Sequence, residues 1–165
     1  MAIVKKLKQH PPLPPSRYEV GIYCRVSTAS KTQVVSAGHQ LSGLITDVAN
    51  SHQARLYDVY LDIQSGRSSD NRKNLMRLLD DCRAGRVTLV YTKSISRFAR
   101  NTVDVLTIVR ELKEMNVPVY FENEQLYSFD KEAELAISLH GAIAQGESEN
   151  KSENRISMYQ SSYGT

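Results

Sequence analysis

The chain has 165 residues, of which 41% are apolar and 24% are charged, and its formal net charge is +3. This size and composition are typical of one compact domain with a buried core, and neither disorder nor a membrane span is needed to explain them. No apolar run approaches the roughly 20 residues that cross a bilayer, and the N-terminus lacks the apolar stretch of a secretory signal, so we expect a cytoplasmic protein.

Charge and cysteine content narrow the possible partners only a little. The mild positive charge is a weak argument for an anionic partner, because an ordinary solvated surface explains it equally well. The two cysteines, Cys24 and Cys82, are too few for a disulfide framework and lie inside apolar patterns, so we interpret them as buried thiols. Neither has a second Cys or His at ligand spacing, which argues against a zinc site.

In chain order, the first feature is a proline-rich arm. Residues 1–17 combine a cluster of lysines with the stretch "HPPLPP", which predicts a flexible, extended segment. From Tyr18 onward, short β-branched runs alternate with helical patterns. Strands are predicted at 18–26, 54–62, 87–93 and 117–123, and helices at about 33–52, 72–84 and 101–116. This alternation predicts an α/β fold with a mostly parallel central sheet flanked by helices.

The helix at 72–84 has the clearest pattern. Its apolar residues recur at i, i+3, i+4 and i+7, namely Leu75, Leu78, Leu79 and Cys82. Asp70 can cap its start and Gly85 can end it.

A long helix is predicted to open near Asp130 and to run through residues 131–154, a length that is unusual unless the helix leaves the body of the domain. Its apolar stripe suits packing on the sheet or on a second subunit and consists of Leu135, Ile137, Leu139, Ala142 and Ile143. The sequence after Gly146 is polar, and we expect it to have little reason to stay helical alone, because short unpacked helices are marginal. No repeat and no second domain are expected.

Polar side chains follow three of the predicted strands. Ligands of open parallel sheets bind beyond the carboxyl ends of the strands, so these residues have the strongest claim to function. They are Arg25 and Ser27 after the first strand, Asp62, Arg67 and Arg72 after the second, and Lys93, Arg97 and Arg100 after the third. Arginines at such a rim predict a phosphate ligand, because the planar guanidinium pairs bidentately with phosphate oxygens.

Each of these residues also has an ordinary structural interpretation. A serine after a strand is most often a turn former or a helix cap, and an arginine near a helix start is usually a solvated charge. Asp62 can bind a metal or cap a turn, and the metal is the weaker choice because no second acidic residue follows a strand nearby. The stretch "SGRSSDNRK" does not match the phosphate-loop pattern, and the four histidines show no pattern of a serine triad. The convergence of several arginines on one rim is what favours a functional site.

Four sequence blocks, "YCRVST", "SAGHQ", "DIQSGRSSDNR" and "TKSISRFARNT", resemble in this order the catalytic domain of serine recombinases, the resolvase, invertase and large-integrase superfamily. The resemblance spans about Val20 to Gln145, and the last block is most similar to the large integrases and transposases. It implies a resolvase-like fold of flavodoxin-like topology with a long C-terminal helix. The catalytic domain would be residues 18–145, and residues 146–165 would be the end of the long helix and a tail, with no DNA-binding module.

The resemblance also implies a chemical mechanism. Ser27 would be the nucleophile that attacks a DNA phosphodiester, releases the 3′ hydroxyl and stays joined to the 5′ phosphate until the strand is rejoined. The active-site arginines implied by the blocks are Arg25, Arg72, Arg97 and Arg100, with supporting roles for Gln40 and Asp62. Ser96 stands where many relatives have an aspartate, so any acid–base role of that aspartate does not carry over. Arg67 lies at a variable position and is left out of the site.

Arginines in place of a metal can stabilise the charge of a phosphoryl transition state, so we expect no cofactor and no metal. The implied partners are DNA and further copies of the protein, as a homodimer and as a tetramer on synapsed DNA. Alone, this chain is expected to bind DNA weakly and in a salt-dependent way. The alternatives are a non-catalytic phosphate-binding module of flavodoxin-like topology and an assembly domain that only dimerises a DNA-binding partner.

Overall fold

A computed structural model of the chain describes residues 17–27, 31–64 and 71–162. Its sheet has five strands in the order β2-β1-β3-β4-β5. β1 (Tyr18–Ser27), β2 (Ala54–Gln64), β3 (Leu89–Thr92) and β4 (Val119–Phe121) are parallel, and β5 (Leu126–Tyr127) pairs antiparallel with β4. The predicted α/β fold with a mostly parallel sheet is confirmed. The predicted arm falls almost entirely outside the described residues, as does Asp70.

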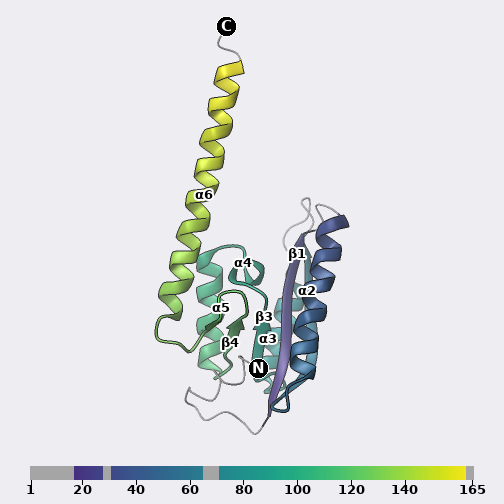
Figure 1. The fold of residues 1–165 in the computed structure, drawn as a ribbon. Helices are drawn as coiled ribbons and strands as arrows, with labels where there is room; N and C mark the ends of the chain where they lie inside the picture. The colour runs from purple at the N-terminus through teal and green to yellow at the C-terminus, as the bar shows by residue number, and fades with distance from the viewer. Residues whose placement is uncertain (1–16, 28–30, 65–70, 163–165) are drawn as a thin grey trace.

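The helices cover both faces of the sheet. α2 (Lys31–Ala49) packs Leu44 and Val48 on one face, against Ile22, Leu89 and their neighbours. α3 (Lys73–Arg83), α4 (Ile95–Phe98) and α5 (Thr102–Glu114) cover the opposite face (Figure 1). The start of α6 (Ala133–Ser162) packs on α5 and joins the same core. Two separate apolar layers therefore hold the sheet between them.

Both cysteines are buried, which confirms their interpretation as core thiols. Cys24 lies with Val26 and Ala37 on the α2 side, and Cys82 lies in the core on the α3 side. Burial raises the pKa of the Cys82 thiol to about 12, so this side chain is an apolar filler at neutral pH.

α3 ends as its sequence predicts. Gly85 has a φ of 73°, its N–H donates to the carbonyl of Cys82, and the N–H of Arg86 donates to the carbonyl of Asp81. These two bonds form a Schellman motif, which satisfies the last carbonyls of the helix and needs a residue that tolerates positive φ. Glycine at this position therefore ends the helix.

α6 differs from the prediction in one respect. It begins three residues after Asp130 and leaves the body of the domain, as expected (Figure 1). The polar segment after Gly146, however, continues as helix to Ser162, so the expectation that it has little reason to stay helical was wrong. Propagation adds one hydrogen bond per residue to a helix already nucleated by packing, and the side chain of Gln145 donates to that of Glu149 one turn on.

The apolar stripe of α6 divides into two parts. Ile137 is fully buried against the core, whereas Leu135, Leu139 and Ile143 are 63%, 56% and 65% exposed. These three residues are spaced by four and therefore share one face of the helix. Within the described residues, none of the helices combines the length and apolarity needed to cross a membrane.

Candidate active site

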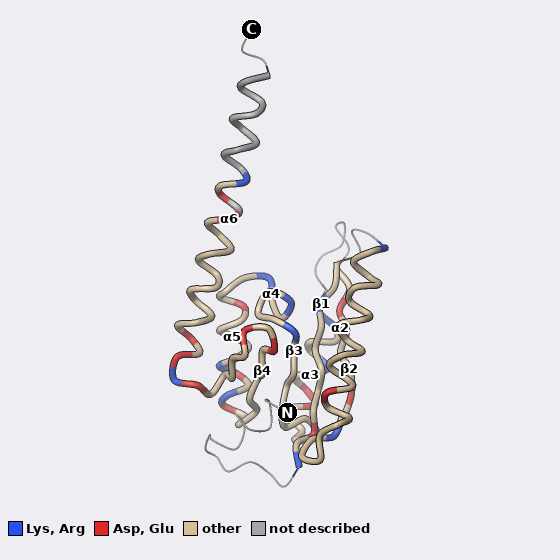
Figure 2. Tube along the Cα trace, in the orientation of Figure 1, with Lys and Arg blue, Asp and Glu red and all other residues tan. Residues whose placement is uncertain are grey.

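The candidate site lies at the carboxyl ends of β1, β2 and β3, where α4 and the N-termini of α3 and α5 meet. Lysine and arginine positions gather around α4 and the adjoining strand ends (Figure 2). This is the rim at which the sequence predicted a phosphate site. The parallel register brings Ser27 beside Gln64 and Tyr23 beside Thr92, so residues far apart in the sequence meet at one edge.

Ser27 is the last residue of β1 and is exposed. It pairs in register with Gln64, the last residue of β2. Because side chains alternate along a strand, Ser27 and Arg25 lie on the same face of the sheet. The hydroxyl is therefore outside the core and on the same face of the sheet as Arg25.

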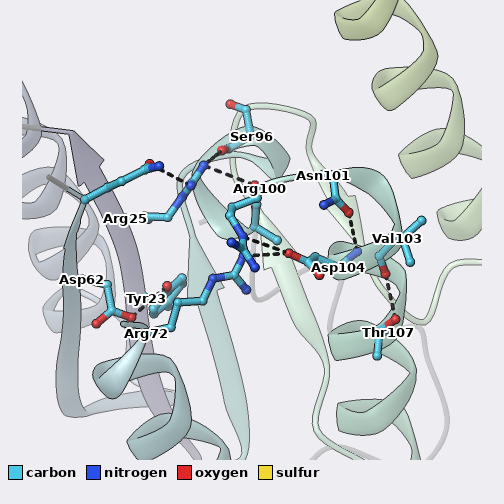
Figure 3. A network of polar contacts seen from close by, with 12 residues as sticks. Tyr23, Arg25, Asp62, Arg72, Ser96, Arg100, Asn101, Val103, Asp104 and Thr107 are labelled. Atoms are coloured by element: carbon cyan, nitrogen blue, oxygen red, sulfur yellow. Dashed lines mark hydrogen bonds and ion pairs between the residues drawn. The ribbon is translucent and has the colours of Figure 1, made fainter. Parts of the chain in front are cut away.

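Arg25 is held by neutral oxygen atoms. Its Nη1 donates to Oε1 of Gln64 at 2.9 Å, and its Nη2 lies 3.3 Å from the carbonyl oxygen of Ser96 and 3.4 Å from that of Ala99. The guanidinium thus bridges the end of β2 and the short helix α4, and these partners orient it without cancelling its charge. Figure 3 shows it reaching from β1 toward Ser96.

Asp62 has a positioning role that the sequence left open. Its buried carboxylate accepts hydrogen bonds from the backbone N–H of Asn74 and Leu75, each at 3.0 Å, and from the Tyr23 hydroxyl at 3.0 Å. These two N–H groups are in the first turn of α3, so Asp62 caps this helix from the neighbouring strand. Arg72 is the residue immediately before α3. The cap therefore fixes the point at which Arg72 enters the site.

The environment of Tyr23 indicates how the charges are arranged. Burial raises the pKa of its hydroxyl well above the usual range, and the carboxylate of Asp62 acts in the same direction. The positive charges of Arg72 and Arg25 act in the opposite direction, which places both guanidiniums within electrostatic reach of Tyr23. Tyr23 therefore stays protonated and remains a hydrogen-bond donor to Asp62.

Arg72 and Arg100 converge on a single carboxylate. Nη2 of Arg72 donates to Oδ2 of Asp104 at 2.9 Å, and Nε of Arg100 lies 3.5 Å from the same oxygen. The three side chains come from the start of α3, the α4–α5 connection and the first turn of α5 (Figure 3). Two of the predicted arginines are thus close enough to share one anionic oxygen.

Arg97 lies in α4 and Gln40 in α2, helices that cover opposite faces of the sheet. The charge of Arg97 reaches the thiol of Cys24, whose pKa is raised by burial and lowered in part by this arginine. Cys24 belongs to the layer under α2, the helix that carries Gln40. Oε1 of Gln40 is buried and has no hydrogen-bond partner among the described residues, and its Nε2 lies 3.4 Å from Oγ of Ser36. Among the described residues, neither side chain forms a hydrogen bond or an ion pair with Asp104.

Two other residues of the rim have structural partners. The Lys93 ammonium pairs with the Glu122 carboxylate at 2.7 Å, which neutralises its charge. The Ser96 hydroxyl lies 3.1 Å from that of Ser94. Arg67 lies outside the described residues.

Comparison with known proteins fits this geometry. The sequence profile of the family described as "Resolvase, N terminal domain" matches residues 20–161. The chain belongs to this resolvase family. A site-specific recombinase of Escherichia coli and a resolvase/recombinase of Pseudomonas putida are 28% and 27% identical to it over 125 residues, or 76% of the chain. The resolvase chain spans only 60% and 62% of the length of these two relatives.

Solved structures agree on the fold of the resolvase domain. A resolvase family site-specific recombinase from Streptococcus pneumoniae superposes with a TM-score of 0.61 at 25% identity, over 90% of this chain and 100% of that one. The N-terminal catalytic domain of TP901-1 integrase superposes with a TM-score of 0.57, over 81% of this chain and 98% of that one. Its identity is 20%, so this second likeness concerns the fold alone.

Sequence reasoning missed two residues of the candidate site. Gln64 ends β2 and accepts from Arg25, and its place two residues beyond the predicted strand end was the available signal. In the sequence, Asp104 is an acidic residue in the first turn of a helix. The helix dipole favours a negative charge at this position, which is sufficient to explain the residue. Nothing in its local pattern indicates that two arginines meet it.

Proposed function

We propose that this resolvase domain is the catalytic domain of a site-specific DNA recombinase that cleaves and rejoins DNA through a phosphoserine bond at Ser27. The observation that carries the proposal is the position of an exposed serine hydroxyl at a strand end shared with Arg25, at the rim where Arg72 and Arg100 converge on one anionic oxygen. A phosphodiester needs a nucleophile on one side and fixed cations around its oxygens. The rim offers both.

In the proposed reaction, Oγ of Ser27 attacks the phosphorus of one DNA strand. The Oγ–P bond forms as the P–O3′ bond breaks, and the proton that the serine hydroxyl loses is balanced by the proton that O3′ gains. The 5′ phosphate stays on Ser27, so the energy of the broken phosphodiester is retained. Attack of a 3′ hydroxyl on this phosphoserine restores the serine and a DNA strand without ATP.

The arginines would take the role that metal ions have in other phosphoryl-transfer sites. Guanidiniums stay charged at all physiological pH values and pair with phosphate oxygens in a fixed fork geometry. Arg25, Arg72 and Arg100 would surround the phosphate, with Arg97 joining them from α4. Gln40 and Asp62 would support the site, and for Asp62 the cap on α3 is the physical means by which it does so.

Self-association is the second part of the proposal. Leu135, Leu139 and Ile143 form an exposed apolar face on the part of α6 that packs on α5. Burying such a face against a second copy removes apolar area from water, at about 25 cal/mol per Å². We propose that two copies form a dimer through α6 and that two such dimers assemble on synapsed DNA in the cytoplasm. The catalytic domain would then be residues 18–145, with the remainder of α6 extending from it.

The test is trapping of a covalent adduct. The native protein is incubated with a duplex that carries its crossover site with a nick, and the products are resolved on a denaturing gel. We expect protein joined to the 5′ end of the cleaved strand, with no adduct from the Ser27→Ala variant although it still binds the DNA. The matched control is Ser96→Ala, which removes another hydroxyl from the same rim and should keep the adduct. An adduct that persists in Ser27→Ala contradicts the proposal.

A further inference from the structure

Asp104 occupies the position in which two site arginines would meet an anion. A single oxygen, Oδ2, pairs with Arg72 at 2.9 Å and with Arg100 at 3.5 Å. The Arg72 side chain is only 12% exposed and that of Asp104 31%, so the contact between them is partly shielded from water. Shielding strengthens an ion pair relative to one on the open surface.

We propose that Asp104 is an internal substitute for a phosphate oxygen, which DNA must displace before Arg72 and Arg100 can hold the scissile phosphate. This inference rests on the proposed function and adds a regulatory step to the same site. Carboxylate and phosphate present the same kind of anionic acceptor to a guanidinium. The N–H groups that face Oδ2 are the ones for which a phosphate oxygen would have to compete with Asp104.

The anchoring of Asp104 makes the exchange physically reasonable. Asp104 lies in the first turn of α5, and its backbone N–H donates to Oδ1 of the helix cap Asn101 at 2.9 Å. A carboxylate there interacts favourably with the helix N-terminus, and this interaction persists when the arginines leave. The arginines are the longer and more adaptable side chains. The guanidiniums would therefore move toward the phosphate while Asp104 stays in place.

Two further observations support this exchange. Arg100 and Asp104 can be reached from solvent, and Arg25 has partners of a different kind. Arg100 and Asp104 both line a groove of ≈ 650 Å³ between the α4–α5 segment and α6, so an anion from solvent can reach the pair. Arg25 differs, because its acceptors are the neutral oxygens of Gln64 and the α4 carbonyls. The site thus keeps one guanidinium oriented and charged while two others are held by a carboxylate.

The consequence is a threshold for phosphate binding. If the guanidiniums are engaged with Asp104 in about nine of ten molecules, the apparent affinity for phosphate is about tenfold below that of the released site. Asp104→Asn keeps the size of the side chain and the backbone N–H that donates to Asn101, but it removes the negative charge. This variant should therefore bind phosphate about tenfold more tightly than the parent protein.

The experiment is a titration of the native protein with inorganic phosphate, followed by the ¹⁵N and ¹H NMR resonances of the arginine Nε–H groups. The control is Asp80→Asn, which makes the same chemical change at an exposed carboxylate that pairs with Arg83 on α3. This control reports the general effect of one added positive charge, and its phosphate affinity should stay within about twofold of the parent. Asp104→Ala provides a second variant, and thermal unfolding of each shows that it is folded.

A phosphate affinity of Asp104→Asn and Asp104→Ala that is equal to or lower than that of Asp80→Asn would overturn the inference, because Asp104 would then only position the arginines. The adduct assay separates this result from failure of the proposed function. Tighter phosphate binding without any Ser27 adduct would support the exchange and contradict the recombinase. An adduct without tighter phosphate binding would support the recombinase and contradict the exchange. Where both hold, Asp104→Asn should also form the adduct faster at low DNA concentration.

Discussion

At the scale of single residues, the carboxylate of Asp62 connects the fold to the candidate site. The family resemblance implied a supporting role without a mechanism, and the geometry supplies one. Two backbone donors of α3 and one buried hydroxyl depend on this carboxylate. An unsatisfied buried donor costs free energy, so the same contacts that stabilise α3 also determine the position of Arg72.

We predict that Asp62→Ala lowers the free energy of unfolding by about 3 kcal/mol, because it removes a cap and leaves three donors without this acceptor. Tyr23→Phe should cost only about 1 kcal/mol, since it keeps the cap and removes one hydrogen bond. Urea unfolding followed by circular dichroism measures both. Equal stabilities of Asp62→Ala and Tyr23→Phe would mean that the helix cap contributes little.

At the scale of elements, the contact between α6 and α5 depends on one glycine. A Cβ built on Gly141 would lie 1.6 Å from Oγ1 and 2.8 Å from Cβ of Thr102, the first residue of α5. Changing the Thr102 rotamer would relieve only the first of these clashes. The helices can therefore pack at this distance only while residue 141 has no side chain. Because Thr102 lies two residues from both Arg100 and Asp104, the path of α6 is set directly beside the site.

We predict that Gly141→Ala destabilises the domain by about 1–2 kcal/mol, although alanine is the better helix former by about 1 kcal/mol. Gly146→Ala is the matched control: nothing lies within 4 Å of its Cβ, so it should be neutral or stabilising. Adding Thr102→Ala to Gly141→Ala should recover part of the loss. Denaturant unfolding decides the point, and a Gly141→Ala variant as stable as Gly146→Ala would refute the close contact.

The elements themselves were predictable to differing degrees. Long segments with a clear period, such as α3 and α5, were found within about two residues of their predicted bounds. The one-turn helix α4 and the two-residue strand β5 were missed, because such short elements show no periodicity and depend on tertiary contacts. The polar half of α6 was misjudged because its helicity was considered apart from the packed half that nucleates it.

At the scale of the whole molecule, the rim could be predicted because parallel topology fixes where strand ends meet. Ser27, Arg25, Arg72 and Arg100 were expected at one edge from this rule alone, and they lie at the edge where β1 and β2 end and α3 and α5 begin. What the sequence did not contain was the pairing inside that edge. The link from Arg25 to Gln64 and the link from Arg72 to Asp104 join residues 39 and 32 positions apart, and no local pattern encodes them.

Self-association is a property of the whole molecule, and the exposed face of α6 makes it testable. We predict that Leu139→Lys raises the dimer dissociation constant at least tenfold, because it would bury an unpaired charge in the centre of the proposed interface. Met76→Lys on α3, which changes a comparably exposed apolar residue, should leave it unchanged. Sedimentation equilibrium at several protein concentrations gives both constants. Unchanged association of Leu139→Lys would exclude this face as the dimer contact.

The measurement that most directly tests the central claim is identification of the residue that carries DNA in the trapped adduct. The adduct is treated with nuclease and trypsin, and the peptide that retains a nucleotide is sequenced by mass spectrometry. We predict a 5′-phosphate ester on the hydroxyl of Ser27. A nucleotide attached to any other side chain would contradict the account.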